Sequence, residues 1–330
     1  MSTPLYSKAP ITIIGAGAWG TAMATVLAHN GYQVLIWCYE DTVTQTINTH
    51  HCNTTYLPSI ELSHSIHATT SIERACKESS IIFQAVPVKA ISSVFAQAAP
   101  YLDASHTIVN LSKGIEYSSL DLPCDIIKKN IRHDVTLATL GGPNFAHDLA
   151  LQATTATTLA TTSTATGHAL KKILDNDYFT SFISTDLIGT QIGGAFKNVI
   201  AIGAGIAHGA GAYENTRAYL ITQGLAEISL LGQALGAQPE TIYGLAGLGD
   251  LVLCCTGTQS RNFKLGFDLG QKISFETITA TYSHLPEGIN TLTSLEQLRK
   301  RYNLTLPLCQ NIYNIVFQNA LPTTLLQNIG

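Results

Sequence analysis

The chain has 330 residues, of which 45% are hydrophobic and 12% are charged, and its net charge is −4. Soluble proteins average roughly 25% charged residues, so this composition predicts a large core and a buried subunit interface. The lack of a basic run argues against a nucleic-acid partner, and no apolar run approaches the ~18 residues of a membrane-spanning helix.

The N-terminal segment MSTPLYSKAP lacks the apolar core of a signal peptide. The cysteines are scattered without C-x-x-C spacing, which is typical of reduced thiols, so we expect a cytoplasmic protein. The stretch His50-His51-Cys52 could form half of a metal site, but a polar surface turn explains it equally well. Since no second pair of ligands stands out, we expect no bound metal.

The stretch ITIIGAGAWGTA begins as a strand and continues as a helix. The branched residues at 11–14 favour an extended chain, whereas from Trp19 onward the apolar residues recur at helical spacing. Between them, Gly15 allows a tight turn, Gly17 lets the backbone approach phosphate groups and Gly20 lets the helix pack on its strand. This order predicts a Rossmann-type dinucleotide site.

Further short apolar runs alternate with helical or polar stretches in the first half of the chain, and they predict strands at 34–37, 81–86, 107–110 and 136–140. The threonine-rich stretch 153–167 predicts another strand and a helix cap at Ser163 or Thr164, with a disordered linker as the alternative. The alternation predicts an α/β fold. We expect a doubly wound parallel sheet with helices on both faces over residues 1–188.

The second half of the chain is rich in alanine, glycine and leucine and shows few β-branched alternations. It predicts an all-α domain over residues 189–330, with small residues between 193 and 228 allowing close helix packing. Because this half of the chain is rich in alanine and leucine, we expect the protein to assemble as a homodimer.

Polar groups are expected to gather where the parallel strands end, because ligands of such sheets bind at their carboxyl edge. Lys113 stands between Ser112 and Gly114 after one predicted strand, and the stretch LGGPNFAHD follows another. The ammonium of Lys113 could therefore reach a bound nicotinamide. The alternative is a solvated surface lysine.

Lys197 interrupts a helix of apolar and small residues, where an unpaired charge is costly. It could form a structural ion pair, or it could transfer protons with its pKa lowered to about 7 or 8 by burial and by a second cation such as Lys113. We favour proton transfer.

The stretch GLAGLGDLVLCCTGTQSRN places glycines before Asp250, so that this carboxylate can begin a helix and orient Lys197. Arg261 and Asn262 follow in what the sequence predicts to be a polar turn, where the guanidinium suits a phosphate. Such a turn can equally be an exposed surface turn with no functional role. Glu287 precedes Gly288 in a second predicted turn and could receive a ribose hydroxyl or pair with Arg261.

Six motifs in this order resemble the bacterial NAD(P)-dependent glycerol-3-phosphate dehydrogenases: GAGAWGTAMA, LSKGIE, GGPNFA, GGAFKNVIAIGAG, GLGDLVLCCTGTQSRN and PEGINT. The resemblance spans about Ile11 to Leu308 and implies reduction of dihydroxyacetone phosphate to sn-glycerol 3-phosphate for phospholipid synthesis. It implies that Lys197 gives and takes the proton at C2, and that Lys113 contacts both substrate and cofactor.

The resemblance also implies the binding positions. The catalytic group is implied to be Lys197, Lys113 and Asp250. The substrate site is implied at Lys113, Gly142, Asn144, Lys197, Asp250, Ser260, Arg261 and Asn262, the last two nearest the phosphate. The cofactor site is implied at Gly15, Gly17, Ala18, Trp19, Gly20, Tyr39, Glu40, Lys113, Ala146, Arg261 and Glu287. Asn144 stands where the family usually has serine or threonine, but it still offers a hydrogen-bonding side chain.

The end of the second strand departs from the family pattern. Where the family often has an arginine two residues after the tryptophan, this chain reads Trp37-Cys38-Tyr39-Glu40. The cation that would pair with the 2′-phosphate of NADP is missing, and Glu40 could accept the ribose hydroxyl of NAD. The sequence leaves both cofactors open and slightly favours NAD.

Two other functions remain to be distinguished. A β-hydroxyacid or 6-phosphogluconate-type dehydrogenase would share the architecture, but Ser260-Arg261-Asn262 favours a phosphate over a carboxylate. A non-catalytic NAD-sensing module would bind the cofactor without turnover.

Overall fold

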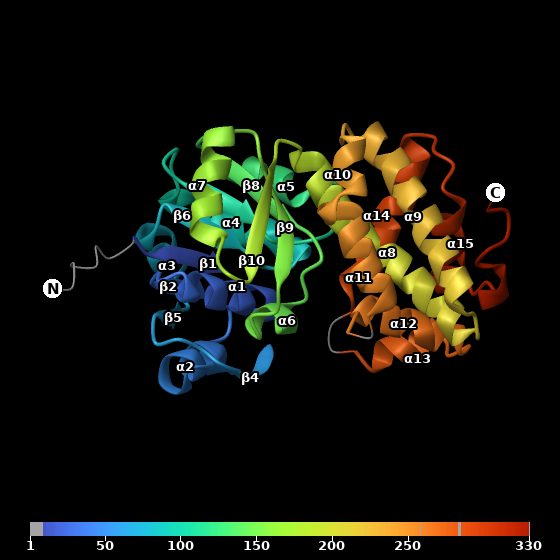
Figure 1. Ribbon diagram of the computed structural model, residues 1–330, viewed down its shortest axis with the longest axis horizontal. Helices are drawn as coiled ribbons and strands as arrows, with labels where there is room; N and C mark the ends of the chain where they lie inside the picture. Colours follow the sequence, from blue (N-terminus) through green and yellow to red (C-terminus); the bar gives the residue numbers. More distant parts are fainter. Residues whose placement is uncertain (1–8, 258, 283–284, 330) are drawn as a thin grey trace. The chain divides into compact units, whose positions relative to one another are not determined.

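The computed structural model describes residues 9–257, 259–282 and 285–329, and Figure 1 labels most of its helices and strands. The chain divides into two compact units. The first holds the described residues up to Ser112 together with 124–140 and 144–185, and the second holds 113–123, 141–143 and the described residues from Asp186 on. The predicted domain boundary after residue 188 stays a prediction. Most of the segment on which the signal-peptide prediction rests lies outside the described residues.

The first unit is built on an eight-stranded sheet with the order β10-β9-β8-β7-β6-β1-β2-β5. Its strands are β1 (Ile11–Ile14), β2 (Val34–Trp37), β5 (Ile66–Thr69), β6 (Ile81–Gln84), β7 (Thr107–Asn110), β8 (Thr136–Gly141), β9 (Thr155–Thr161) and β10 (Phe179–Ser184). Pairing is parallel from β5 through β8 and again between β9 and β10, which confirms the parallel sheet. A separate antiparallel hairpin joins β3 (Cys52–Asn53) to β4 (Leu57–Glu61).

Strand β1 lies where the strand order reverses. The chain runs from β1 outward to β2 and β5 and then returns to β6 on the other side of β1. In such sheets the crevice at the carboxyl ends of the two central strands receives nucleotides. Gly15 follows β1 with φ +116°, and a Cβ at this position would lie 2.8 Å from the carbonyl carbon of Ala85, which follows β6. Only glycine fits this turn.

Helices cover both faces of the sheet. They are α1 (Ala18–His29), α2 (Asp41–His50), α3 (Ile72–Glu78), α4 (Val88–Ala98), the short η1 (Ala99–Tyr101), α5 (Pro123–Asn130), α6 (Ala146–Ala150) and α7 (Thr164–Leu174). Met23 of α1 and Leu170 of α7 belong to one buried core, whereas Ile91 of α4 and Ile127 of α5 belong to a second. Two cores on one sheet confirm the doubly wound architecture, since successive strand residues point to opposite faces.

From Asp186 on, the described residues of the second unit are mainly helical, as predicted. Its elements are α8 (Leu187–Gly209), α9 (Glu214–Ala234), α10 (Pro239–Tyr243), the π-helical turn η2 (Leu245–Gly249), α11 (Asp250–Thr256), α12 (Arg261–Gly270), α13 (Phe275–Ala280), α14 (Glu287–Arg301), α15 (Pro307–Phe317) and η3 (Pro322–Thr324). Helix α8 packs against α9, α11, α12, α14 and α15. Among the helices that the structure describes, none is both long and apolar enough to cross a membrane.

The predicted polar turns at Arg261 and Glu287 are wrong. Arg261 is the first residue of α12, because Ser260 accepts a hydrogen bond from the N–H of Phe263 and so caps the helix. Glu287 likewise begins α14, directly after Pro286. Both side chains therefore project from the first turn of a helix.

Candidate functional site

Asp250 lies at the centre of a buried charged cluster in the second unit. Its side chain is fully buried at the first residue of α11. Lys197 of α8 donates to Oδ1, and Lys113, from the loop after β7, donates to Oδ2 at 2.5 Å. The two lysines that the sequence singled out therefore share one carboxylate.

Glycines on α8 allow this cluster to form. A Cβ at Gly193 would lie 2.4 Å from the carbonyl oxygen of Ala246, so its absence lets the chain before Asp250 approach α8. A Cβ at Gly194 would lie 3.2 Å from Cγ of Lys113, whose stem runs along the helix. The two glycines before AFKN thus bring three chain segments together.

The shared carboxylate affects the two lysines differently. Burial alone lowers the pKa of Lys197, but its contacts with Asp250 and Cys254 outweigh burial and raise that pKa above its ordinary value. Burial lowers the pKa of Lys113, and the charge of Lys197 lowers it further. The expectation of a lowered pKa at Lys197 is therefore wrong. It counted burial and a second cation, but not the negative charge of Asp250, which raises the pKa.

Cys254 is a member of the cluster that the sequence did not single out. Its Sγ accepts a hydrogen bond from Lys197 Nζ at 3.1 Å and lies 3.8 Å from Oδ1 of Asp250. Burial raises the pKa of the Cys254 thiol, which keeps it protonated. The available signal was its spacing four residues after Asp250, which places both side chains on one face of α11.

The cluster has two basic side chains and one acidic side chain. Two ammonium groups, Lys113 and Lys197, meet one carboxylate and a neutral thiol, and the Lys113 ammonium also donates to the carbonyl oxygen of Gly142 at 3.1 Å. Buried charges without a counterion are costly. Such a site is suited to an anion, including the oxyanion that develops when a carbonyl group is reduced.

A second polar group of the same unit joins α8, α12 and α14. Asn262, which is buried, donates from Nδ2 to Oδ1 of Asn198 at 2.9 Å. Its own Oδ1 accepts from the N–H of Gly288 at 3.0 Å. Arg261 is exposed beside it, with its guanidinium carbon 6.0 Å from the ring centre of Tyr282. Asn262 therefore links the start of α12 to α8 and to the start of α14. Arg261 provides a positively charged side chain beside these helix ends.

The glycine turn of the first unit fits a dinucleotide. Gly17 caps α1, and a Cβ there would have nothing within 4 Å, whereas a Cβ at Gly20 would lie 2.0 Å from the carbonyl oxygen of Gly15. The first turn, Ala18 and Trp19, thus offers free N–H groups beside open space. Among the described residues, the indole Nε1 of Trp19 is buried without an acceptor.

The end of β2 carries the predicted ribose acceptor. Tyr39 is 83% exposed, and Glu40 occupies the N-cap position of α2. The Oε1 of Glu40 accepts a hydrogen bond from the hydroxyl of Tyr56 at 2.7 Å. Tyr56 and the buried Asn53, both from the hairpin segment, are the residues near this site that the sequence did not single out.

The motif GGPNFA is divided between the two units. Gly142 belongs to the second unit and contacts Lys113, whereas Asn144 and Ala146 belong to the first. The Nδ2 of Asn144 donates to the carbonyl oxygen of Ala156 at 3.2 Å, and Ala146 begins α6. The roles implied for Asn144 and Ala146 stay predictions.

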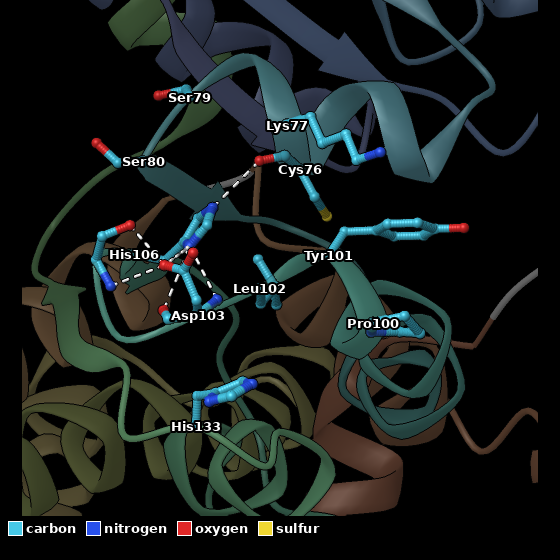
Figure 2. A pocket seen from close by; sticks show the side chains of 11 residues that line it. Cys76, Lys77, Ser79, Ser80, Pro100, Tyr101, Leu102, Asp103, His106 and His133 are labelled. Carbon is cyan, nitrogen blue, oxygen red and sulfur yellow. Dashed lines mark hydrogen bonds and ion pairs between the residues drawn. The ribbon is translucent and has the colours of Figure 1, made fainter.

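A pocket of about 520 Å³ lies in the first unit before β6 and β7, at the edge opposite the glycine turn. Figure 2 shows the His106 ring between Asp103 and the carbonyl oxygen of Cys76, with bonds of 3.0 and 3.2 Å. Hydrogen bonds from Ser105 lower the pKa of Asp103 to about 2. Both ring nitrogens of His106 and the Asp103 carboxylate are therefore already engaged by neighbouring groups.

The stretch considered as half of a metal site lies at the end of α2. The ring of His51 meets that of His64 edge to face, with 4.0 Å between ring centres. Within residues 9–257, 259–282 and 285–329, no three histidine, cysteine or acidic side chains are grouped as a metal would require.

Comparison with known proteins gives consistent matches along the chain. The family models for the N-terminus and the C-terminus of NAD-dependent glycerol-3-phosphate dehydrogenase match residues 10–167 and 186–327. Glycerol-3-phosphate dehydrogenase (NAD(P)+) of Bacillus licheniformis is 38% identical over 97% of this chain and 93% of its own. The enzyme of the same name from Maricaulis maris is 42% identical over 94% and 92%. The crystal structure of glycerol-3-phosphate dehydrogenase from Coxiella burnetii superposes with a TM-score of 0.92, at 32% identity, over 97% of this chain and 98% of that one.

Proposed function

Because the chain belongs to the NAD-dependent glycerol-3-phosphate dehydrogenase family, we propose that it reduces dihydroxyacetone phosphate to sn-glycerol 3-phosphate for phospholipid synthesis. The observation that carries the proposal is the pair Lys113 and Lys197 on the single carboxylate of Asp250. A buried cluster with an excess positive charge binds a carbonyl group more tightly as its oxygen becomes negative. The enzyme is an NAD(P)-dependent oxidoreductase.

Lys197 is the proton donor in this proposal. The bound nicotinamide supplies the hydride that reduces the carbonyl carbon. The raised pKa of Lys197 keeps this lysine protonated at neutral pH, so a proton is available when the alkoxide forms. Asp250 holds the ammonium in place and prevents it from rotating away. In the reverse reaction the neutral form of the same lysine accepts the proton.

Lys113 acts on the same oxygen by charge. Burial and the charge of Lys197 destabilise the protonated form of Lys113 and so lower its pKa. A bound anionic substrate stabilises that protonated form. Arg261, in the first turn of α12, binds the substrate phosphate with the help of the positive helix end. Ser260, Asn262 and Gly142 complete the substrate site, and Asn144 contributes its amide.

The finer cofactor and assembly assignments belong to the same proposal. The cofactor is NAD in preference to NADP, because Tyr39 stands where the family often has the arginine that binds a 2′-phosphate, and the acidic Glu40 follows it. Lys113, Ala146, Arg261 and Glu287 complete the cofactor site that the glycine turn begins. The protein acts without a metal, in the cytoplasm, as a homodimer.

The test is cofactor oxidation with dihydroxyacetone phosphate by the wild type and by Lys197→Ala. We expect turnover to fall about 10²- to 10⁴-fold, the contribution of a positioned proton donor, while the Kd for NADH measured by calorimetry changes less than about twofold. Lys172→Ala removes an exposed lysine from α7 and serves as the matched control with unchanged turnover.

The alternatives give different results in this assay. Reduction of β-keto acids but not of the phosphate ester would indicate a β-hydroxyacid dehydrogenase. Binding of NADH without turnover of any ketone, unaffected by Lys197→Ala, would indicate a sensing module. Either result contradicts the proposal.

A further inference from the structure

A chain of hydrogen bonds joins the glycine turn after β1 to the residue that follows β2. Asn53 is fully buried, and its Nδ2 donates to the carbonyl oxygen of Ala16 and to Oγ1 of Thr21, both at 2.8 Å. Its Oδ1 accepts from the N–H of Tyr56 at 3.2 Å. The Tyr56 hydroxyl in turn donates to Glu40 Oε1 at 2.7 Å. One short hairpin segment therefore holds both the phosphate-facing backbone and the acidic side chain.

The Glu40 side chain has a specific reason to need such a partner. It occupies the N-cap position of α2 but makes no hydrogen bond to the first turn of that helix. A glutamate on the surface normally samples several rotamers, and fixing one costs conformational entropy before any ligand binds. The bond from Tyr56 selects one rotamer in advance.

The geometry of the bond leaves acceptor capacity for a ligand. The Tyr56 hydroxyl engages Oε1, and within the described part of the chain no donor is bonded to Oε2. The bond to Glu40 is the chief cause that raises the pKa of Tyr56 to about 12, so its hydroxyl stays a donor across the working pH range. The carboxylate therefore remains an oriented anion with one oxygen available.

We infer that Tyr56 is a positioning residue that holds the Glu40 carboxylate against the adenosine ribose and thereby sets the discrimination between NADH and NADPH. The inference rests on the proposed dinucleotide-binding function of the first unit. A carboxylate fixed in this way accepts the 2′-hydroxyl of NADH. It also repels the 2′-phosphate of NADPH, and because Tyr56 holds it, it cannot rotate away.

The experiment measures the Kd of NADH and of NADPH by isothermal titration calorimetry on the full chain, without substrate. In Tyr56→Phe the aromatic ring stays and only the hydroxyl is lost. We expect the ratio of the NADPH Kd to the NADH Kd to fall about fivefold, the usual net contribution of one hydrogen bond. Tyr213→Phe, which alters a side chain that is 85% exposed in the second unit, should leave both constants unchanged.

A double-mutant cycle separates positioning from direct contact. In a Glu40→Gln background there is no carboxylate to orient, so adding Tyr56→Phe should change the ratio by less than about twofold. An equal fall in both backgrounds would mean that Tyr56 acts on the nucleotide itself and not through Glu40. That result, or an unchanged ratio in Tyr56→Phe alone, overturns the inference.

The same data test the proposed cofactor separately. A wild-type protein that binds NADPH more tightly than NADH contradicts the proposed preference for NAD. The effect of Tyr56→Phe is a change in the ratio from whatever value the wild type has, so a fall supports the positioning role even then. Failure of wild-type binding to either nucleotide overturns both.

Discussion

At the scale of single residues, the contact between Lys197 and Cys254 joins the proposed proton donor to a second helix. The Cys254 sulfur lies 3.1 Å from the ammonium, and it shares that ammonium with Asp250. In Cys254→Ala the ammonium loses one of its partners and becomes less well oriented. We expect kcat to fall about fivefold and the KM for dihydroxyacetone phosphate to change less than about twofold. Steady-state kinetics provide the measurement.

The neighbouring cysteine supplies the control for this prediction. Cys255 is also fully buried, but it contributes to the core rather than to the charged cluster. Cys255→Ala should lower the thermal midpoint while leaving kcat near the wild-type value. Cys254→Ser restores a small hydrogen-bonding group and should recover much of the lost turnover. Equal kcat values in Cys254→Ala and the wild type would show that Asp250 alone orients the lysine.

The residues at this scale were partly accessible from the sequence. Lys113, Lys197 and Asp250 stood out because charged residues in small, apolar or glycine-rich surroundings need a partner, and the structure places the three in contact. The direction of the pKa of Lys197 was not accessible, because it depends on the contacts of this lysine with Asp250 and Cys254 in the folded chain. Sequence spacing does not report those contacts.

At the scale of elements, helix α15 depends on a buried carboxylate from α9. Glu227 is 1% exposed, and its two oxygens accept from the N–H groups of Leu308 and Cys309 at 2.7 and 2.9 Å. These are orphan donors in the first turn of α15, where the helix dipole also favours a negative charge. Glu227→Gln removes the charge and one acceptor, so we expect the free energy of unfolding to fall by roughly 2 to 3 kcal/mol. Urea unfolding provides the measurement.

Glu214 provides a matched control in the same helix. Its side chain is 79% exposed and pairs with Arg217 on the surface at 3.0 Å. An exposed pair contributes little, so Glu214→Gln should change the free energy of unfolding by less than about 0.5 kcal/mol. If the two variants were equally stable, the carboxylate of Glu227 would make no net contribution to the free energy of unfolding.

Elements with a strong local signal could be predicted and others could not. Strands β1 and β2 follow from short runs of apolar residues, and their predicted bounds are confirmed. The cap of α7 is Ser163, one of the two candidates, and its hydroxyl accepts from Thr166. The hairpin strand β3 has only two residues, too few for any periodicity, and its Asn53 is held by a hydrogen bond to the carbonyl oxygen of Ala16 in the glycine turn. Such tertiary causes leave no local pattern.

At the scale of the whole molecule, the order of sheet and helices was predictable but the membership of the units was not. The change in amino-acid composition near residue 188 marks the start of the long helices. The short segments 113–123 and 141–143 belong with those helices, although strands of the first unit flank them in the sequence. Lys113 and Gly142 come from these segments, so the cluster around Asp250 depends on contacts that composition and periodicity do not encode.

The assembly of the molecule gives the last prediction. Only 12% of the residues are charged, about half the ordinary share, and large apolar side chains such as Tyr213 and Leu230 are 85% and 50% exposed. We expect some of these side chains to be covered by a second copy of the chain, as exposed apolar groups are at interfaces. Light scattering after size exclusion, at low micromolar concentration, should therefore give twice the chain mass of 35.3 kDa. The dimer should persist in high salt, because salt screens charges but strengthens apolar contacts. A monomer mass would contradict the prediction, and a dimer that dissociates in salt would show that charged rather than apolar groups form the interface.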